Sequence, residues 1–212
     1  MIRSRFLVAI GLALVVGALV LPSIGAPAAP TSMTRAADLR VTLNNLLTEH
    51  TALAASATLG ALTGNTAQFR AAAAQLDANS DDIIRAVGSV YGPDAQRAFD
   101  PLWKKHIGFV VDYTTGLATN NKAKQDKAVQ DLLAYTQEFG AFLNSATKSL
   151  PTDAVAGLVR EHILTLKAVI DAQRAGNHPA VYTNLRKAMR HMQMVADPLA
   201  EAIVKQFPDR FR

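Results

Sequence analysis

The sequence contains no cysteine. This absence excludes disulfide bonds, thiolate metal ligands and the cysteine to which a lipoprotein anchor is attached. No stretch alternates apolar and polar residues over a useful length, so the sequence predicts no β-strands. Aromatic residues are sparse, prolines are confined to a few joints and alanine is abundant. This composition is typical of a helical bundle.

Motifs of the common enzymes are also missing. The sequence has no serine nucleophile elbow, no glycine-rich phosphate loop and no His-Glu-x-x-His motif. Its 22 Lys and Arg residues outnumber its 17 Asp and Glu residues, but the basic residues are scattered, which does not indicate a nucleic-acid partner. We therefore expect a protein that is not an enzyme and that does not bind nucleic acid.

One long apolar run lies at the N-terminus. Two arginines precede residues 6–21, which are almost all apolar, and small residues follow. This pattern predicts a secretory signal peptide over residues 1–29, cleaved after Ala28 or Ala29. The alternative is an uncleaved anchor, although the run is slightly short for a membrane span. We expect a secreted or extracytoplasmic protein of the bacterial cell surface, with membrane contact only through this segment if it is uncleaved.

The remaining chain, residues 30–212, is long enough for a single domain with one core. Helical periodicity runs through nearly all of it, and glycine, asparagine and proline interrupt it at regular intervals. The predicted helices cover residues 34–62, 66–91, 94–119, 122–148, 152–175 and 179–206. The expected fold is an all-α helical bundle built from three antiparallel helix hairpins, six helices in all.

The hairpins form an internal repeat with a period of 56 residues, a feature that must be identified before single motifs are interpreted. The repeats cover about residues 45–100, 101–156 and 157–212. Three histidines occupy one repeat position: His50, His106 and His162. Three asparagines align at the predicted turns, where asparagine tolerates left-handed backbone geometry: Asn65, Asn121 and Asn177.

Each repeated histidine lies on the apolar face of its predicted helix, where an unpaired polar group costs about 1–3 kcal/mol. Counting residues to each turn places every histidine opposite a polar residue of the partner helix. Those opposing residues are Asn79, Tyr135 and His191. One helical turn further lie Asp82, Glu138 and Met194. The sequence therefore predicts one polar layer inside an otherwise apolar bundle.

Histidine combined with a thioether points to a copper site. His191 and Met194 share a helical face opposite His162, and such ligands suit copper, particularly Cu(I). Because four helices close around one axis and six do not, we expect the site in the second and third hairpins. The expected ligands are His106, His162, His191 and Met194, with His50 in a flanking position and Tyr135, Glu138, Asn79 and Asp82 around them.

These residues favour a non-catalytic metal-binding protein for storage, buffering or sensing, with copper as the first choice of ion. Two alternatives stay open. In the first, the histidines form a hydrogen-bonded layer that fixes helix register in a structural or interaction module. In the second, histidine and methionine ligate haem non-covalently, since the sequence has no Cys-x-x-Cys-His motif.

Three segments carry a resemblance to a known family. They are HIGFVVDYTTG at residues 106–116, HMQMVADPLA at residues 191–200 and residues 76–80. With them, essentially the whole mature chain resembles a family of secreted, largely uncharacterised bacterial helical proteins. Some similar sequences are labelled copper amine oxidase-like, which implies a connection with copper. The sequence lacks the Asn-Tyr-Asp/Glu and His-x-His motifs of amine oxidases, so the resemblance implies a secreted bundle and not their catalysis.

Overall fold

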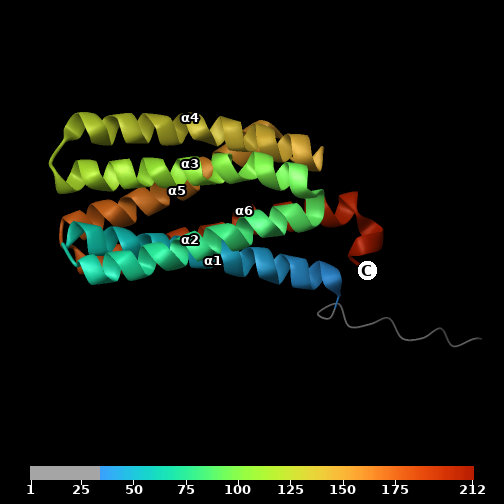
Figure 1. The fold of residues 1–212 in the computed structure, drawn as a ribbon, viewed down its shortest axis with the longest axis horizontal. Coiled ribbons are helices and arrows are strands. Elements are labelled where there is room, and N and C mark those ends of the chain that lie inside the picture. Colours follow the sequence, from blue (N-terminus) through green and yellow to red (C-terminus); the bar gives the residue numbers. More distant parts are fainter. Residues whose placement is uncertain (1–33) are drawn as a thin grey trace, which may run out of the picture.

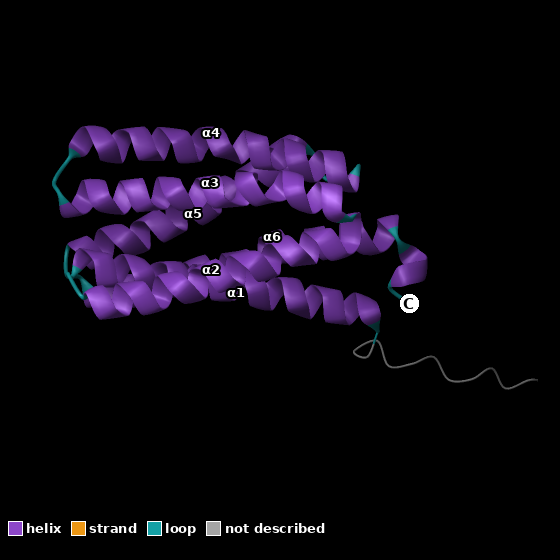
Figure 2. Cartoon of the chain, in the orientation of Figure 1, coloured by secondary structure: helices purple, strands orange, loops and turns teal. Residues whose placement is uncertain are grey.

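The computed structural model describes residues 34–212. The predicted signal peptide and its cleavage site lie outside the described residues. The described chain forms six α-helices and one short 3₁₀ helix: α1 (Arg35–Leu62), α2 (Thr66–Tyr91), α3 (Pro93–Ala118), α4 (Lys122–Thr147), α5 (Thr152–Arg174), α6 (His178–Gln206) and η2 (Pro208–Arg210). Residues 34–212 contain no strand (Figure 2). The predicted all-α fold of three hairpins is confirmed, and each α-helix boundary lies within one residue of its predicted position.

The six helices surround one axis. Helices that are consecutive in the chain pack side by side, and α6 closes the ring by packing against α1. In addition, α1 contacts both α3 and α5, and α3 contacts α5. The first helix of every hairpin therefore faces the axis. The structure differs here from the expectation that four helices of two hairpins enclose the centre, because all three repeats contribute to it.

The two ends of the bundle are different. The three hairpin turns lie together at one end, and the chain enters α1 and leaves α6 at the other (Figure 1). We call the latter the open end. No helix among residues 34–212 is both long enough and apolar enough to cross a membrane.

The turns repeat in structure as well as in sequence. Each has a left-handed residue immediately before the helix cap: Gly64, Asn120 and Gly176, with φ of 71°, 53° and 66°. The next residue caps the following helix by accepting a hydrogen bond from a backbone N–H three residues on. These caps are Asn65, Asn121 and Asn177. The sequence predicted left-handed geometry at these three asparagines, and this is wrong by one residue: the left-handed residue is the one before each of them. The asparagines have negative φ because they cap the following helix.

The core changes character along the bundle. Its largest cluster includes Phe99, Trp103, Tyr135 and Phe139, which come from α3 and α4. A second cluster, between α1, α5 and α6, contains small residues such as Ala55 and Ala172. Small side chains let helices approach closely, whereas large rings fill the wider space toward the open end.

We expect Gly60→Ala to destabilise the fold because α1 and α2 approach closely beside their turn. A methyl group at Gly60 is only 2.6 Å from the backbone nitrogen of Phe69, and backbone cannot move aside cheaply. The free energy of unfolding should fall by about 1–3 kcal/mol in denaturant titrations. Gly108→Ala is the control. A methyl group there meets nothing within 4 Å in α3, so alanine should stabilise that helix by up to about 1 kcal/mol. Equal effects of the two substitutions contradict a steric role for the close approach at Gly60.

Candidate functional site

The three repeated histidines meet at the bundle axis. His50, His106 and His162 come from α1, α3 and α5, the three helices that face it. The Nε2 atoms of His50 and His106 lie 3.4 Å apart, so one ring donates a hydrogen bond to the other. The ring centroids are separated by 5.4 Å for His50 and His106 and by 6.1 Å for His50 and His162. We call these three residues the histidine cluster.

Aromatic rings enclose part of the histidine cluster. The Trp103 indole packs edge-on against His106 and tilted against His50, with centroid distances of 4.7 and 4.9 Å. The Tyr135 ring stacks on His106 at 5.2 Å. His50, His106, Trp103 and Tyr135 are all buried, and His162 is half-buried. The imidazoles therefore lie in surroundings from which water is largely excluded.

This burial keeps the histidine cluster uncharged at neutral pH. Loss of hydration is the main cause, because a charged imidazole is costly in a dry site. It lowers the pKa of His50 well below 6.5, and the nearby His106 and His162 lower it further. Burial lowers the pKa of His106 to about 4, against a smaller opposing effect of the Trp103 backbone. Burial, followed by the proximity of His106 and His191, lowers the pKa of His162 to about 3.

Several polar atoms of this region are buried without a hydrogen-bond partner among residues 34–212. They are the Nδ1 atoms of His50, His106 and His162, the Nε1 atom of Trp103 and the hydroxyl oxygen of Tyr135. Each such atom costs about 1–3 kcal/mol when it is left unpaired. Native proteins contain few of them, and a bound ion or ligand is a common reason for their presence. Their concentration in one place marks this region as the candidate site.

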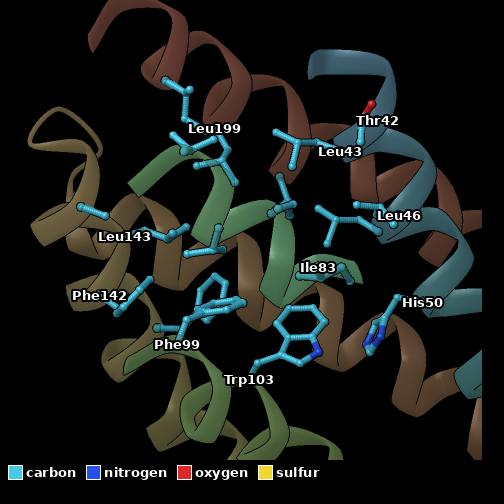
Figure 3. Close-up of a pocket in the computed structure, with 18 of the residues that line it drawn as sticks. Thr42, Leu43, Leu46, His50, Ile83, Phe99, Trp103, Phe142, Leu143 and Leu199 are labelled. Carbon is cyan, nitrogen blue, oxygen red and sulfur yellow. The ribbon is translucent and has the colours of Figure 1, made fainter. Parts of the chain in front are cut away.

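A cavity of about 270 Å³ connects the histidine cluster with the open end of the bundle. Its walls are almost entirely apolar and include side chains from all six helices. Figure 3 shows Trp103 and His50 side by side in this pocket, with Phe99 and Ile83 close by. The exposed residues Arg35 and Ser89 lie at its outer end. A second cavity, of about 40 Å³, is also lined by all three histidines, so the histidine cluster separates two spaces.

The other residues predicted for the site make different contacts. His191 is half-buried, and its Nε2 lies 2.8 Å from the carbonyl oxygen of Leu158, in α5. The Asn79 side chain donates in the same way to the carbonyl of Leu46, in α1, at 3.1 Å. Counting to the turns therefore paired the right positions on neighbouring helices. Neither side chain, however, bonds to the histidine: each bonds to the helix backbone one turn before it, and Asn79 also donates to the Glu49 carboxylate at 2.8 Å.

Three further predicted residues lie toward the surface. Met194 is 58% exposed. Glu138 forms an ion pair with Lys105 at 2.7 Å, and Asp82 pairs with Arg85 in its own helix. Within residues 34–212, no group of three or more histidine and acidic side chains is already arranged to hold a metal ion. The structure thus brings His50, His106 and His162 together with Tyr135, and it does not bring Met194, Glu138 or Asp82 to them.

Sequence reasoning did not identify Trp103 or the large cavity as parts of the site. Trp103 is the chain's one tryptophan, and it lies three residues before His106, one turn away on the same face. That spacing was a usable signal for Trp103. No sequence signal indicated the cavity, because its shape depends on how six separate helices pack.

Comparisons of the chain with protein-family models, with curated proteins and with solved structures find no match. The fold and the site define a six-helix bundle of three repeated hairpins with a buried histidine cluster.

We expect the stability of the fold to decrease in acid because of the histidine cluster. Its pKa values are lowered in the folded state, so the unfolded chain binds more protons once the pH falls below about 6.5. The free energy of unfolding has its full value above that pH. It then falls by up to about 1.4 kcal/mol per pH unit for each histidine, until the pH reaches about 4 for His106 and about 3 for His162.

Denaturant unfolding at pH 7.5, 6.0 and 5.0 measures this slope. His106→Gln should reduce the slope of the unfolding free energy against pH by the contribution of about one bound proton. The carboxylates contribute equally in both proteins. His178→Gln is the control, since His178 is exposed at the start of α6. An unchanged slope in the His106 variant contradicts the assignment of the acid sensitivity to the histidine cluster.

Proposed function

We propose that this protein binds one transition-metal ion through His50, His106 and His162, and that it stores or buffers copper outside the cytoplasm. The observation that carries the proposal is the meeting of three equivalent imidazoles, one from each repeat, at the axis of the bundle. A metal binds the neutral form of imidazole, and burial favours that form in all three residues.

The spacing of two of these rings supports the proposal. Metal–nitrogen bonds to histidine are about 2.0–2.1 Å long, so two ligands in a tetrahedral site lie about 3.3–3.4 Å apart. The Nε2 atoms of His50 and His106 lie 3.4 Å apart. The His162 ring is farther from His50 than the His106 ring is. The proposal therefore requires His162 to turn toward the pair when the ion binds, and the 40 Å³ cavity beside all three rings provides space for this.

The ligand set bears on which ion is bound. Imidazole ligands suit copper and zinc, and copper has the highest affinity of the divalent first-row metals. The exposed position of Met194 removes the thioether from the set that the sequence suggested. We propose copper as the ion and treat zinc as the direct comparison. The extracytoplasmic location is a separate part of the proposal and rests on the signal-peptide pattern of residues 1–29.

Metal titration of the mature protein, purified without an affinity tag and treated with a chelator, tests the proposed function. We expect one copper ion per chain, measured by elemental analysis after gel filtration. His106→Ala or His162→Ala should weaken binding by more than about 100-fold, because even residues that only support a ligand contribute about 10- to 100-fold. Met194→Ala and His178→Gln should bind as the unmodified protein does.

Circular dichroism and thermal melting establish that each variant is folded. Tighter binding of zinc than of copper overturns the choice of ion. Unchanged copper binding in a folded variant that lacks His106 and His162 overturns the site. Absence of binding at one equivalent overturns the function, and the histidine cluster is then a polar layer that sets helix register.

A further inference from the structure

The 270 Å³ cavity has the features of a binding site for an apolar molecule. Its apolar side chains include Leu43, Leu46, Ile83 and Leu199, drawn in Figure 3. Many of them are only half-buried, which means that the protein itself does not fully cover them. An apolar cavity of about 150 Å³ is already large enough to stay dry and bind a benzene-sized molecule. This cavity is larger, and it reaches the protein surface at the open end.

The size and shape of the cavity limit its occupant. At about 30 Å³ for each water-sized group, 270 Å³ accommodates about nine non-hydrogen atoms. The lining residues of α1 extend from Arg35 to His50, which is about 22 Å along a helix that rises 1.5 Å per residue. A narrow molecule suits such a space better than a broad one. A haem group or a two-chain lipid is too large for it.

The polar atoms at the inner end determine the chemistry of the ligand's polar group. The indole N–H of Trp103 is a donor with no acceptor capacity, and it is buried without a partner among the described residues. Tyr135 also lines the cavity, and its hydroxyl group is likewise buried without a partner among the described residues. A ligand therefore satisfies the indole N–H only if it supplies a hydrogen-bond acceptor, such as a carbonyl oxygen. This requirement distinguishes the cavity from a simple packing defect.

The accepting group must also be uncharged. The fully charged side chains that line the cavity are Arg35 and Asp38, and both are exposed at its outer end. No lysine or arginine among the described residues lines the inner end, so a carboxylate there would find no permanently charged partner. An unpaired carboxylate in an apolar site is strongly unfavourable. A carbonyl oxygen accepts hydrogen bonds without this cost.

We propose that the cavity binds a slender, neutral carbonyl compound of about nine non-hydrogen atoms, with its oxygen toward Trp103 and its hydrocarbon chain toward the open end. Ketones, aldehydes and small esters share this chemistry. The assignment goes beyond metal binding and does not depend on it, because it rests on the cavity walls and on Trp103 and Tyr135.

Calorimetry on the chelator-treated mature protein tests the proposal with three probes of similar size. They are octan-2-one, the hydrocarbon propylbenzene and the anion octanoate. We expect one octan-2-one per chain and octanoate binding at least about tenfold weaker. The emission of Trp103 should change on binding, and as the single tryptophan it reports on this site alone.

Two variants locate the ligand. Trp103→Phe keeps an aromatic ring but removes the donor, so it should weaken octan-2-one binding about five- to tenfold, the effect of one hydrogen bond. Propylbenzene binding should change by less than about twofold. Ala86→Phe places a ring at a lining position and should weaken both ligands in a protein whose thermal melting shows that it is folded.

Distinct results overturn the proposal. Absence of octan-2-one binding contradicts the proposal that the cavity is a binding site. If octanoate binds as tightly as the ketone, the requirement for an uncharged polar group is wrong. Equal weakening of ketone and hydrocarbon by Trp103→Phe overturns the orientation of the oxygen toward the indole. Parallel copper titrations keep the two hypotheses separate, because failure of metal binding leaves the ketone results unaffected.

Discussion

The mutual contact of α1, α3 and α5 at the bundle axis is the constraint on which the site depends. Each of these helices is the first of its hairpin, so their contact brings residues of equal repeat position to equal height. A histidine that occurs once in each hairpin is then present three times at one point. The 3.4 Å approach of two imidazole nitrogens is a direct result. The same histidines on the outer helices would lie apart.

This arrangement places polar rings in a region that otherwise stabilises the fold by burying apolar surface. The fold accommodates them because neutral imidazole is far less costly to bury than a charged group. The buried apolar residues above and below the histidine cluster, including Phe99, Leu132 and Ile163, offset the remaining cost. Hydrogen bonds from Asn79 and His191 to helix carbonyls satisfy two more polar side chains in the same layer.

The sequence was sufficient to predict the helices and the hairpins. Capping asparagines and glycine-containing turns are local signals, and they placed each helix boundary to within one residue. The repeat likewise showed that three histidines share a position. It did not show which helix of each hairpin faces the axis, since that choice depends on contacts between residues more than fifty positions apart. For this reason Met194 was expected to face inward, whereas the structure buries Met192 and exposes Met194.

The expectation of a four-helix centre failed for a related reason. A ring of six equal helices leaves an open middle, but here three inner helices fill it and three outer helices cover them. Small residues make this possible along α1, where Ala54, Ala55 and Ala57 are all buried. Their significance is visible only when the neighbouring helices are known. The cavity is likewise a property of the assembled bundle and leaves no pattern in any single segment.

Trp103 illustrates what a single chain of three repeats can do that three identical chains cannot. Its equivalents in the other repeats are Leu47 and Val159, so at this repeat position one helix carries a hydrogen-bond donor and the other two carry only hydrocarbon. In a symmetric trimer each substitution would occur three times around the axis. The covalent connection lets each repeat diverge separately. The three imidazoles are therefore placed symmetrically about the axis, whereas the indole donor lies on one side only. A molecule that binds beside them has one preferred orientation.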